Sequence, residues 1–369
     1  MSENVPLVNL KIQRDRILDE VQAGWQAVLE NTSFIVGPAV DQFEADYARY
    51  CGASHCVGVG NGTDAIEYSL RALDIGHGDE VIAPANTFVA TIGAIVRAGA
   101  TPKLVDCDEN FLINPALIAA AITERTKAVV PVHLYGQMAP MDEVIAAAGD
   151  LPVLEDAAQS QGASQAGKRS GSVGVLASTS FYPGKNLGAF GDAGAVTTSD
   201  AALDERLRRL RNHGGIAKYE HLEVGGNSRL DSLQAVVLSA KLKVLDDWNS
   251  ERRIAAQRYE ELLSGVDGVT LPHEVSGNVH VWHLYVVRVP NRDAVLKSLN
   301  NAGIGAGIHY PAPIHLLPAF SSMGLGKGSF PVAESLADEI LSLPIYPGIT
   351  AAQQERVAEE LQNALKQAE

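Results

Sequence analysis

The sequence predicts an α/β protein with a mostly parallel central sheet flanked by helices, followed by a smaller α/β unit. Short apolar runs alternate with helical patterns from residue 55 to about residue 154, and this alternation is typical of parallel strands joined by crossover helices. A long helical pattern then leads into a second α/β pattern. The 369 residues allow two units, and we expect residues 1–245 to form the large domain and residues 246–369 the small one.

The individual elements follow from the spacing of apolar residues. The large unit should begin with helices at 9–30 and, after the Gly37-Pro38 turn, within 34–50. Its expected strands are 55–60, 80–83, 102–106, 128–132, 152–154 and 173–181, with further helices at 65–73, 115–121 and 141–148. Residues 230–263 should form one long helix or two joined ones. The small unit should contain strands at 279–289 and 305–310, and helices at 292–302, near 332–341 and from 351.

Composition and charge exclude several classes of function. The net charge of −15 argues against binding to nucleic acid or to an anionic membrane. The N-terminus has no apolar signal-peptide core, and no apolar run approaches the length of a membrane span, so we expect a cytoplasmic protein. The three cysteines have no CxxC spacing and the ten histidines no paired-ligand spacing, so no disulfide or metal site is predicted.

Asp156 and Lys185 give the first indication of chemistry. Asp156 follows the apolar run at 152–154, and Lys185 lies in the Gly-rich segment SFYPGKNLGAFGDAGAV. An aldehyde cofactor needs an amine with which to form a Schiff base, and a cationic ring nitrogen needs a fixed carboxylate. Pyridoxal phosphate (PLP) would use both residues.

A candidate phosphate site lies at the end of the strand at 55–60. This strand ends in GNGTDA, and a predicted helix follows at once. The N–H groups of a helix N-terminus point outward, as a phosphate requires; Gly62 allows close approach and Thr63 offers a hydroxyl. The alternative is a plain N-cap formed by Asn61, Thr63 or Asp64.

Two more side chains follow strand ends in the same way. Phe88, in ANTFVAT, is placed either to stack on a planar ligand or to pack in the core. Gln159 is close enough to Asp156 to reach an oxygen on a ring held by that acid. Because ligands bind beyond the carboxyl ends of parallel strands, we expect these residues to converge.

EDAAQSQGA, followed by SFYPGKNLGAFGDAGAV, resembles the PLP-dependent sugar aminotransferases of the DegT/DnrJ/EryC1/StrS family. These enzymes have the aspartate aminotransferase fold, fold type I. FIVGPAVDQFE, GVGNGTDA, RNHGG, YEHLEVGGNSRLDSLQAVVL and GIHYPAPIHLLPAF extend the resemblance over nearly the whole chain, in the same order. The resemblance implies a large PLP-binding domain and a smaller C-terminal domain.

The resemblance also implies a role for each candidate residue. Lys185 would form the Schiff base with PLP, and Asp156 would pair with the ring nitrogen. The other implied contacts are Gln159 at the ring hydroxyl, Phe88 against the ring face, Gly62, Thr63 and Ser180 at the phosphate, and Asn227 at the phosphate of the neighbouring subunit. Asn227 therefore implies a homodimer with shared active sites.

The implied reaction is a transamination in two half-reactions. Glutamate would convert the cofactor to pyridoxamine phosphate, and a keto sugar would then accept the amine. Related dehydratases carry histidine in place of the lysine, so Lys185 favours transamination over deoxygenation.

The implied substrate is a nucleotide-sugar. Pocket positions of related enzymes are matched by Tyr219, His221, His309, Tyr310 and His315, and Arg229 is a candidate to hold a diphosphate. The plain alternative is that His309 and Tyr310 end a strand and that prolines shape the following turn. HYPAPIH resembles the members that aminate C-3 of dTDP-3-keto-6-deoxyhexoses.

Two departures from the family pattern affect this substrate assignment. Leu317 and Phe320, in HLLPAF, replace an amide and a phenol, and DENFLIN differs from the commoner form of that segment. A 4-keto nucleotide-sugar and a keto-inositol such as scyllo-inosose are the competing substrates. A protein that binds a nucleotide-sugar without chemistry is the non-enzymatic alternative.

Overall fold

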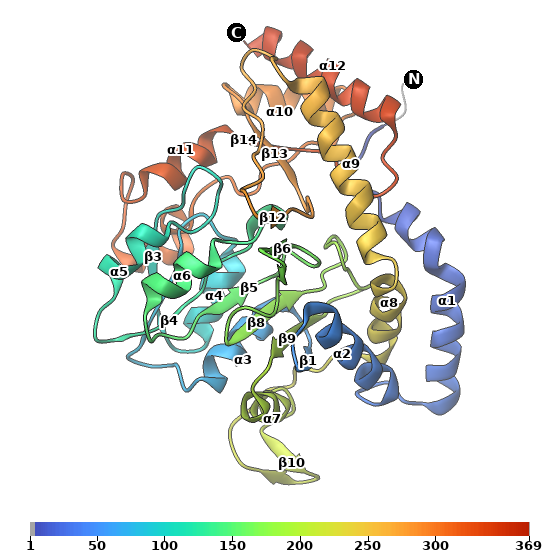
Figure 1. The fold of residues 1–369 in the computed structure, drawn as a ribbon, viewed down its shortest axis with the longest axis vertical. Helices are drawn as coiled ribbons and strands as arrows, with labels where there is room; N and C mark the ends of the chain where they lie inside the picture. The colour runs from blue at the N-terminus through green and yellow to red at the C-terminus, as the bar shows by residue number, and fades with distance from the viewer. Residues whose placement is uncertain (1–3, 369) are drawn as a thin grey trace.

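The computed structural model describes residues 4–368 (Figure 1). Its central sheet consists of a three-stranded part in the order β3-β2-β4 and a four-stranded part in the order β5-β8-β9-β1. Parallel bridges from Val129 to Val153 and from Val132 to Asp156 join the two parts. The strands are β1 (His55–Val59), β2 (Glu80–Pro84), β3 (Thr101–Val105), β4 (Thr126–Val129), β5 (Leu154–Asp156), β8 (Leu176–Ser180) and β9 (Gly194–Thr198).

The sheet is parallel from β3 to β8, as predicted, and β9 is antiparallel to both of its neighbours. We had not predicted β9. The short segment between Ser180 and Gly194 contains no crossover helix, so the chain returns beside β8 in the opposite direction. This segment carries Lys185, which places the lysine in the loop at the end of β8.

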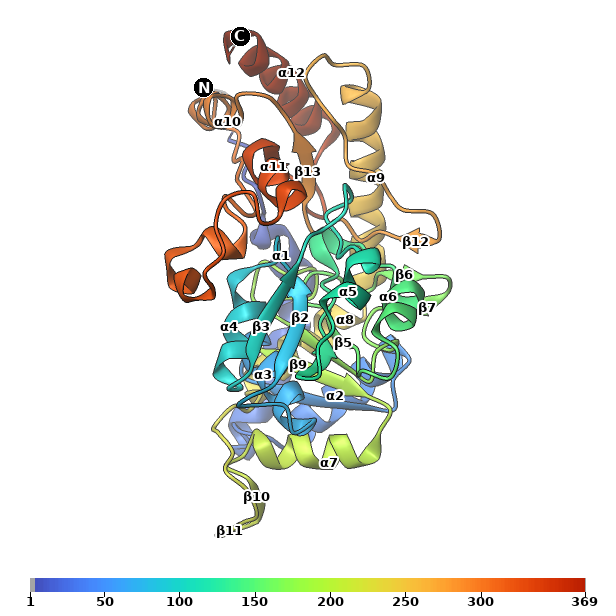
Figure 2. The same ribbon diagram turned by 90° about the vertical axis from the view of Figure 1, so that its left-hand side faces the viewer.

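Helices pack on both faces of the sheet (Figures 1 and 2). The predicted helix at 141–148 is found at those residues, whereas the helix predicted from residue 65 begins earlier, at Gly62. The helical elements of this part are α1 (Leu10–Asn31), α2 (Pro38–Cys51), α3 (Gly62–Ala72), α4 (Val89–Arg97), η1 (Pro115–Leu117), α5 (Ile118–Ala121), η2 (Leu134–Gly136), α6 (Met141–Ala148) and α7 (Ala201–Leu210).

The long helical pattern at 230–263 forms two joined helices, α8 (Ser232–Leu242) and α9 (Leu245–Leu263). The C-terminal part then contains an antiparallel pair, β13 and β14, with helices packed around it. Its elements are β12 (Asn278–Val279), β13 (Tyr285–Arg288), α10 (Arg292–Asn301), η3 (Ile314–Leu316), η4 (Pro318–Met323), α11 (Pro331–Glu339), β14 (Ile340–Leu343) and α12 (Ala351–Ala368).

Two expectations for the C-terminal part were wrong. Residues 305–310 do not form a strand; within them only Gly307 forms a bridge, to Ser342. The helix expected to reach residue 341 ends at Glu339, and Ile340 begins β14 instead. Ile340 begins a strand because pairing with β13, which is distant in the sequence, overrides the local helical pattern.

One core cluster consists of apolar side chains from residue 255 onward together with Val5 from the N-terminal segment. The main cluster of the large sheet also takes in Leu284, Phe320 and Leu336. The two parts of the chain therefore share packed surface, and the division near residue 245 stays a prediction.

Two small hairpins extend from this body. β6 (Ser164–Gln165) pairs with β7 (Lys168–Arg169) and with β12. β10 (Gly215–Ala217) and β11 (Glu220–His221) form a hairpin that projects away from the rest of the molecule (Figure 2). No helix within residues 4–368 has the length and apolar character needed to cross a bilayer.

Candidate active site

A cavity of about 540 Å³ lies at the carboxyl ends of the parallel strands. The turns after β1, β2, β5 and β8 contribute most of its wall, as expected for this type of sheet. The C-terminal part closes it with His283, Leu284, His309 and Tyr310, and the N-terminal segment adds Leu7 and Val8. The predicted site residues that line the cavity are Gly62, Thr63, Phe88, Asp156, Gln159, Ser180, Lys185, His309 and Tyr310.

Lys185 reaches this cavity from a tight turn after β8, in which its N–H donates to the carbonyl of Tyr182 at 2.8 Å. Burial lowers the pKa of Lys185 to about 8, although the charge of Asp156 acts in the opposite direction. A substantial fraction of the lysine is therefore neutral near pH 8. An amine in this state can attack an aldehyde or take up a proton.

Asp156 ends β5 and is 4% exposed. The Thr91 hydroxyl donates to its Oδ2 at 2.7 Å, and the Ala158 N–H donates to its Oδ1 at 3.1 Å. Burial raises the pKa of Asp156 even though the Thr91 hydrogen bond lowers it. A carboxylate that is this poorly solvated favours a cation opposite it, and a protonated pyridine nitrogen provides one.

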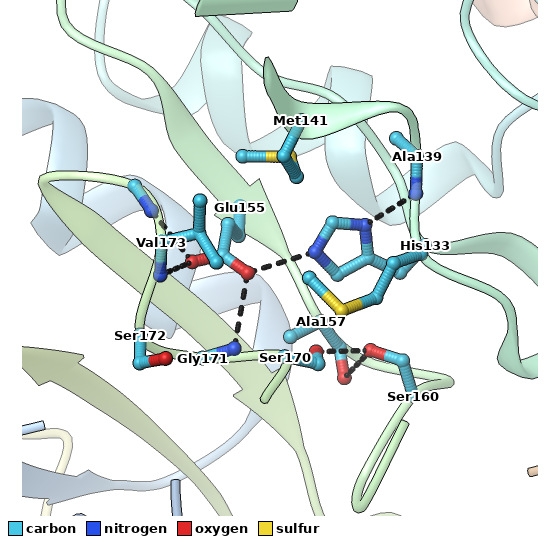
Figure 3. A network of polar contacts seen from close by, with 12 residues as sticks. His133, Ala139, Met141, Glu155, Ala157, Ser160, Ser170, Gly171, Ser172 and Val173 are labelled. Atoms are coloured by element: carbon cyan, nitrogen blue, oxygen red, sulfur yellow. Dashed lines mark hydrogen bonds and ion pairs between the residues drawn. The ribbon is translucent and has the colours of Figure 1, made fainter. Parts of the chain in front are cut away.

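Behind Asp156 lies a buried network centred on Glu155 and His133, both 0% exposed (Figure 3). His133 Nε2 lies 2.8 Å from Glu155 Oε2, while the Ala139 N–H donates to His133 Nδ1 at 3.1 Å. Because Nδ1 accepts, Nε2 carries the proton and donates to Glu155. Glu155 also accepts N–H groups from the turn before β8: Gly171, Val173 and Gly174. The network thus joins the strands that carry Asp156 and Ser180.

The proposed phosphate site lies between the N-terminus of α3 and the end of β8. Asn61 caps the helix, since its Oδ1 accepts the Asp64 N–H at 2.9 Å. The N–H groups of Gly62 and Thr63 have no acceptor within the helix. A Cβ added to Gly62 would lie 2.6 Å from the Ser180 Cβ. The structure therefore shows Asn61 as the helix cap, and the phosphate site beside Gly62 stays a prediction.

Gln159, Tyr310 and Phe88 form the part of the wall where a ring would lie. The Gln159 amide accepts the Tyr135 N–H at 2.7 Å and donates to the Tyr310 hydroxyl at 3.0 Å. The ring centroids of Phe88 and Tyr310 are 4.9 Å apart. An amine, a buried carboxylate, an anion cradle and an aromatic wall in one cavity fit PLP.

The DegT/DnrJ/EryC1/StrS aminotransferase family matches this chain over residues 15–362. The chain belongs to this family. It is 48% identical to the erythromycin biosynthesis sensory transduction protein EryC1 of Saccharopolyspora erythraea, over 94% of this chain and 96% of that protein. It is also 48% identical to dTDP-3-amino-3,6-dideoxy-alpha-D-galactopyranose transaminase of Aneurinibacillus thermoaerophilus, over 96% and 98% of the two chains.

The crystal structure of S. venezuelae DesV in complex with a ketimine intermediate is similar over 100% of this chain and 99% of that one. Its TM-score is 0.96 and its sequence identity 44%. Other relatives are named for UDP-linked and GDP-linked sugars. Family membership confirms the predicted fold type I, the predicted enzyme class and PLP as the cofactor.

Five of the predicted site residues of this aminotransferase do not line the cavity. His315 is buried, and its Nε2 lies 2.9 Å from Glu334 Oε1. We therefore remove it from the substrate site, because η3 directs it into the protein. Tyr219, His221, Asn227 and Arg229 lie on or beside the projecting hairpin, outside the cavity of their own chain. Their predicted roles require a second copy.

The structure also adds cavity residues that sequence reasoning missed. They are Leu7 and Val8 in the N-terminal segment, Tyr182 and Asp192 near Lys185, Thr87 and Thr91 beside Asp156, and His283. Thr91 could have been expected one turn after Phe88, because residues three or four apart share a helix face. No local pattern marked Leu7, Val8 or His283, which come from distant parts of the chain.

Proposed function

We propose that this aminotransferase moves an amino group from glutamate to C-3 of a dTDP-3-keto-6-deoxyhexose, giving a dTDP-3-amino-3,6-dideoxyhexose. Relatives act on dTDP-, UDP- and GDP-linked sugars, so the general substrate class is a keto nucleotide-sugar. Similarity to enzymes named for dTDP-3-amino sugars, at 48%, 45% and 43% identity, supports the narrower choice. The observation that carries the amino transfer itself is the placement of Lys185 and Asp156 in one cavity.

When bound, PLP supplies an aldehyde that carries the amine and a ring that accepts an electron pair. Lys185 would hold this group covalently and, once released, would move the proton between Cα of glutamate and the cofactor, and likewise at the sugar carbon. Asp156 would keep the ring nitrogen protonated. Gln159 would hold the ring oxygen, and Gly62, Thr63 and Ser180 would hold the phosphate.

The sugar would enter on the side of His309 and Tyr310. Burial and the charge of Lys185 lower the pKa of His309 to about 4, so its imidazole is neutral at working pH. Its Nδ1 contacts the Ser342 hydroxyl at 2.8 Å, and its carbonyl accepts from the Tyr135 hydroxyl. Leu317 and Phe320, the two changed side chains in HLLPAF, are not among the residues that line the cavity, and they pack in or against the main apolar core. We interpret them as neutral packing changes.

We further propose a homodimer in which Asn227, Tyr219, His221 and Arg229 complete the partner's site. Large apolar side chains are exposed on and beside the projecting hairpin, which is typical of a surface that contacts another protein. They are Ile216, Tyr219, Leu222 and Val224, the last 83% exposed. Mixing a Lys185→Ala variant with an Asn227→Ala variant tests the sharing. If Asn227 acts across the dimer, mixed dimers contain one intact site and regain activity; if it acts within its own chain, none is regained.

Product analysis tests the substrate. The PLP-loaded enzyme and glutamate would be supplied with 3-keto and 4-keto dTDP-sugars, 3-keto UDP-sugars and scyllo-inosose. We expect an amine at C-3 of the dTDP-sugar. Turnover confined to scyllo-inosose would refute the nucleotide-sugar assignment, and turnover of 4-keto sugars alone would move the site of amination.

Borohydride reduction tests the role of Lys185 independently of the sugar. We expect a reduced cofactor adduct on the peptide that contains Lys185, and loss of both adduct and turnover in Lys185→Ala. A protein that takes up no PLP would instead support a nucleotide-sugar binding role without chemistry.

A further inference from the structure

His283 is a cavity residue to which the reaction described above gives no role. It follows Trp282 in the segment that leads into β13, and so it reaches the site from the C-terminal part of the chain. Its Nδ1 lies 3.2 Å from Oδ1 of Asn186, the residue directly after Lys185. This contact joins the lysine loop to the segment opposite it.

The hydrogen bonds of Asn186 determine which nitrogen of His283 carries the proton. Asn186 is buried, and its Nδ2 donates both hydrogens, to Asn249 Oδ1 at 2.8 Å and to the Val281 carbonyl at 2.8 Å. Both hydrogens are thus committed to acceptors, which orients the amide so that Oδ1 faces His283. An amide oxygen only accepts, so His283 must donate from Nδ1. In a neutral imidazole, Nε2 is then left as an acceptor.

The Nε2 acceptor has no partner among residues 4–368, and the side chain is partly exposed to the cavity. The charged and titratable groups that act on His283 are Lys185, Arg252, His309 and His280. Burial is the main cause that lowers the pKa of His283 well below its ordinary value, and the charges of Lys185 and Arg252 add to it. The ring therefore stays neutral at working pH, so it is a poor base and a constant acceptor.

We propose that His283 is a positioning residue for Lys185: the two side chains are not hydrogen-bonded in this structure, but rotation of the lysine side chain within the cavity lets Nε2 accept an N–H of its amine, which directs the amine lone pair toward the substrate carbon. Lys185 suits this role because it lines the same cavity, precedes Asn186 and acts electrostatically on His283. No bond is made or broken in this contact. The inference rests on the proposed transamination only in assigning proton transfer to Lys185.

Two substitutions separate the two nitrogens of His283. Asparagine places its amide near the Nδ1 position, so His283→Asn keeps a donor for Asn186 and loses the cavity acceptor. Glutamine reaches the Nε2 position, so His283→Gln keeps an acceptor that faces the cavity. A role limited to packing would make both variants behave alike.

The first measurement uses the cofactor-free protein, in which the pH dependence of Lys185 acetylation by acetic anhydride is followed by peptide mass spectrometry. The wild-type midpoint should lie near pH 8. An acceptor stabilises the ammonium form, so we expect His283→Asn to lower the midpoint by roughly one pH unit and His283→Gln to leave it nearly unchanged. Equal midpoints in the two variants would overturn the proposal.

The second measurement reads the protonation of His283 directly in the wild-type protein. In protein labelled with ¹⁵N-histidine, the His283 signals, assigned by their loss in His283→Gln, should show a proton on Nδ1 and none on Nε2. A proton on Nε2 would overturn the proposal.

With PLP and glutamate alone, the half-reaction should slow roughly tenfold in His283→Asn and recover in His283→Gln. Since no sugar is present, failure of the sugar assignment leaves these outcomes unaffected.

Discussion

Replacing Gly62 by alanine should weaken PLP binding while leaving the fold in place. An alanine Cβ would lie 2.6 Å from the Ser180 Cβ, and the two must separate by about 0.8 Å to reach the 3.4 Å of ordinary contact. In the cofactor-free protein the end of β8 can shift to relieve this contact. A bound phosphate would require Ser180 to return to its original position, so the cost of the close contact appears as weaker PLP binding.

Overpacking of this kind costs about 1–3 kcal/mol, which corresponds to a rise in the dissociation constant for PLP of roughly 5-fold to 150-fold. The assay is a PLP titration followed by absorbance, with the unfolding midpoint of the cofactor-free protein measured in parallel. Gly93→Ala in α4 is the matched control, because a Cβ there has no neighbour within 4 Å. If Gly62→Ala bound PLP as tightly as this control does, Gly62 would not belong to the phosphate site.

Three further substitutions test buried ionisable side chains. Asp156→Asn should reduce turnover by roughly 100-fold or more. Because burial raises the pKa of Asp156, its ionised form destabilises the cofactor-free fold above that pKa. The unfolding free energy of the variant should therefore be higher by about 1 kcal/mol at pH 7, and an unchanged denaturant midpoint would contradict this. Glu155→Gln should cost about 1–3 kcal/mol of unfolding free energy, because the amide places an N–H donor where Glu155 accepts backbone N–H groups. Burial opposes ionisation of Glu155, but His133 and the backbone N–H groups lower its pKa, so the wild-type advantage should disappear as pH falls below about 4.3. Lys241, 2% exposed and 5.0 Å from the Phe190 ring, has its pKa lowered by burial to about 8, so wild-type stability should rise with pH from 8 to about 10.4. Lys241→Met should add about 3 kcal/mol at pH 7 and flatten part of that rise in urea titrations, without changing turnover.

The parts of the fold that could be predicted are those whose apolar pattern is local. The strand after residue 55 and α6 each have a strong pattern within their own residues, and the structure shows both. β9 and β14 were missed because each is defined by its partner. β9 returns antiparallel beside β8, and β14 pairs with β13 at residues whose local pattern continues a helix.

The same difference applies to the site. Asp156, Gly62 and Lys185 follow strands directly, so the parallel sheet brings them together. His315 lies only a few residues from Tyr310, yet one 3₁₀ turn directs it to Glu334 instead of the cavity. His283 could not be found from its neighbours, because only the packing of the C-terminal part against the Lys185 loop brings it to the cavity.

In the cofactor-free site, Lys185 and Asp156 are both held away from their ordinary ionisation. Burial lowers the pKa of the lysine and raises that of the acid, and their mutual attraction only partly offsets this. Bound PLP would relieve both at once, since the lysine loses its charge on forming a Schiff base and the acid gains a cationic ring nitrogen opposite it. The protein therefore stores, in two desolvated groups on separate strand ends, part of the free energy with which it holds its cofactor. Groups that are already desolvated need no further removal of water when the cofactor arrives, so the burial that lowers the pKa of Lys185 and raises that of Asp156 favours a ligand that supplies an aldehyde to the first and a cation to the second.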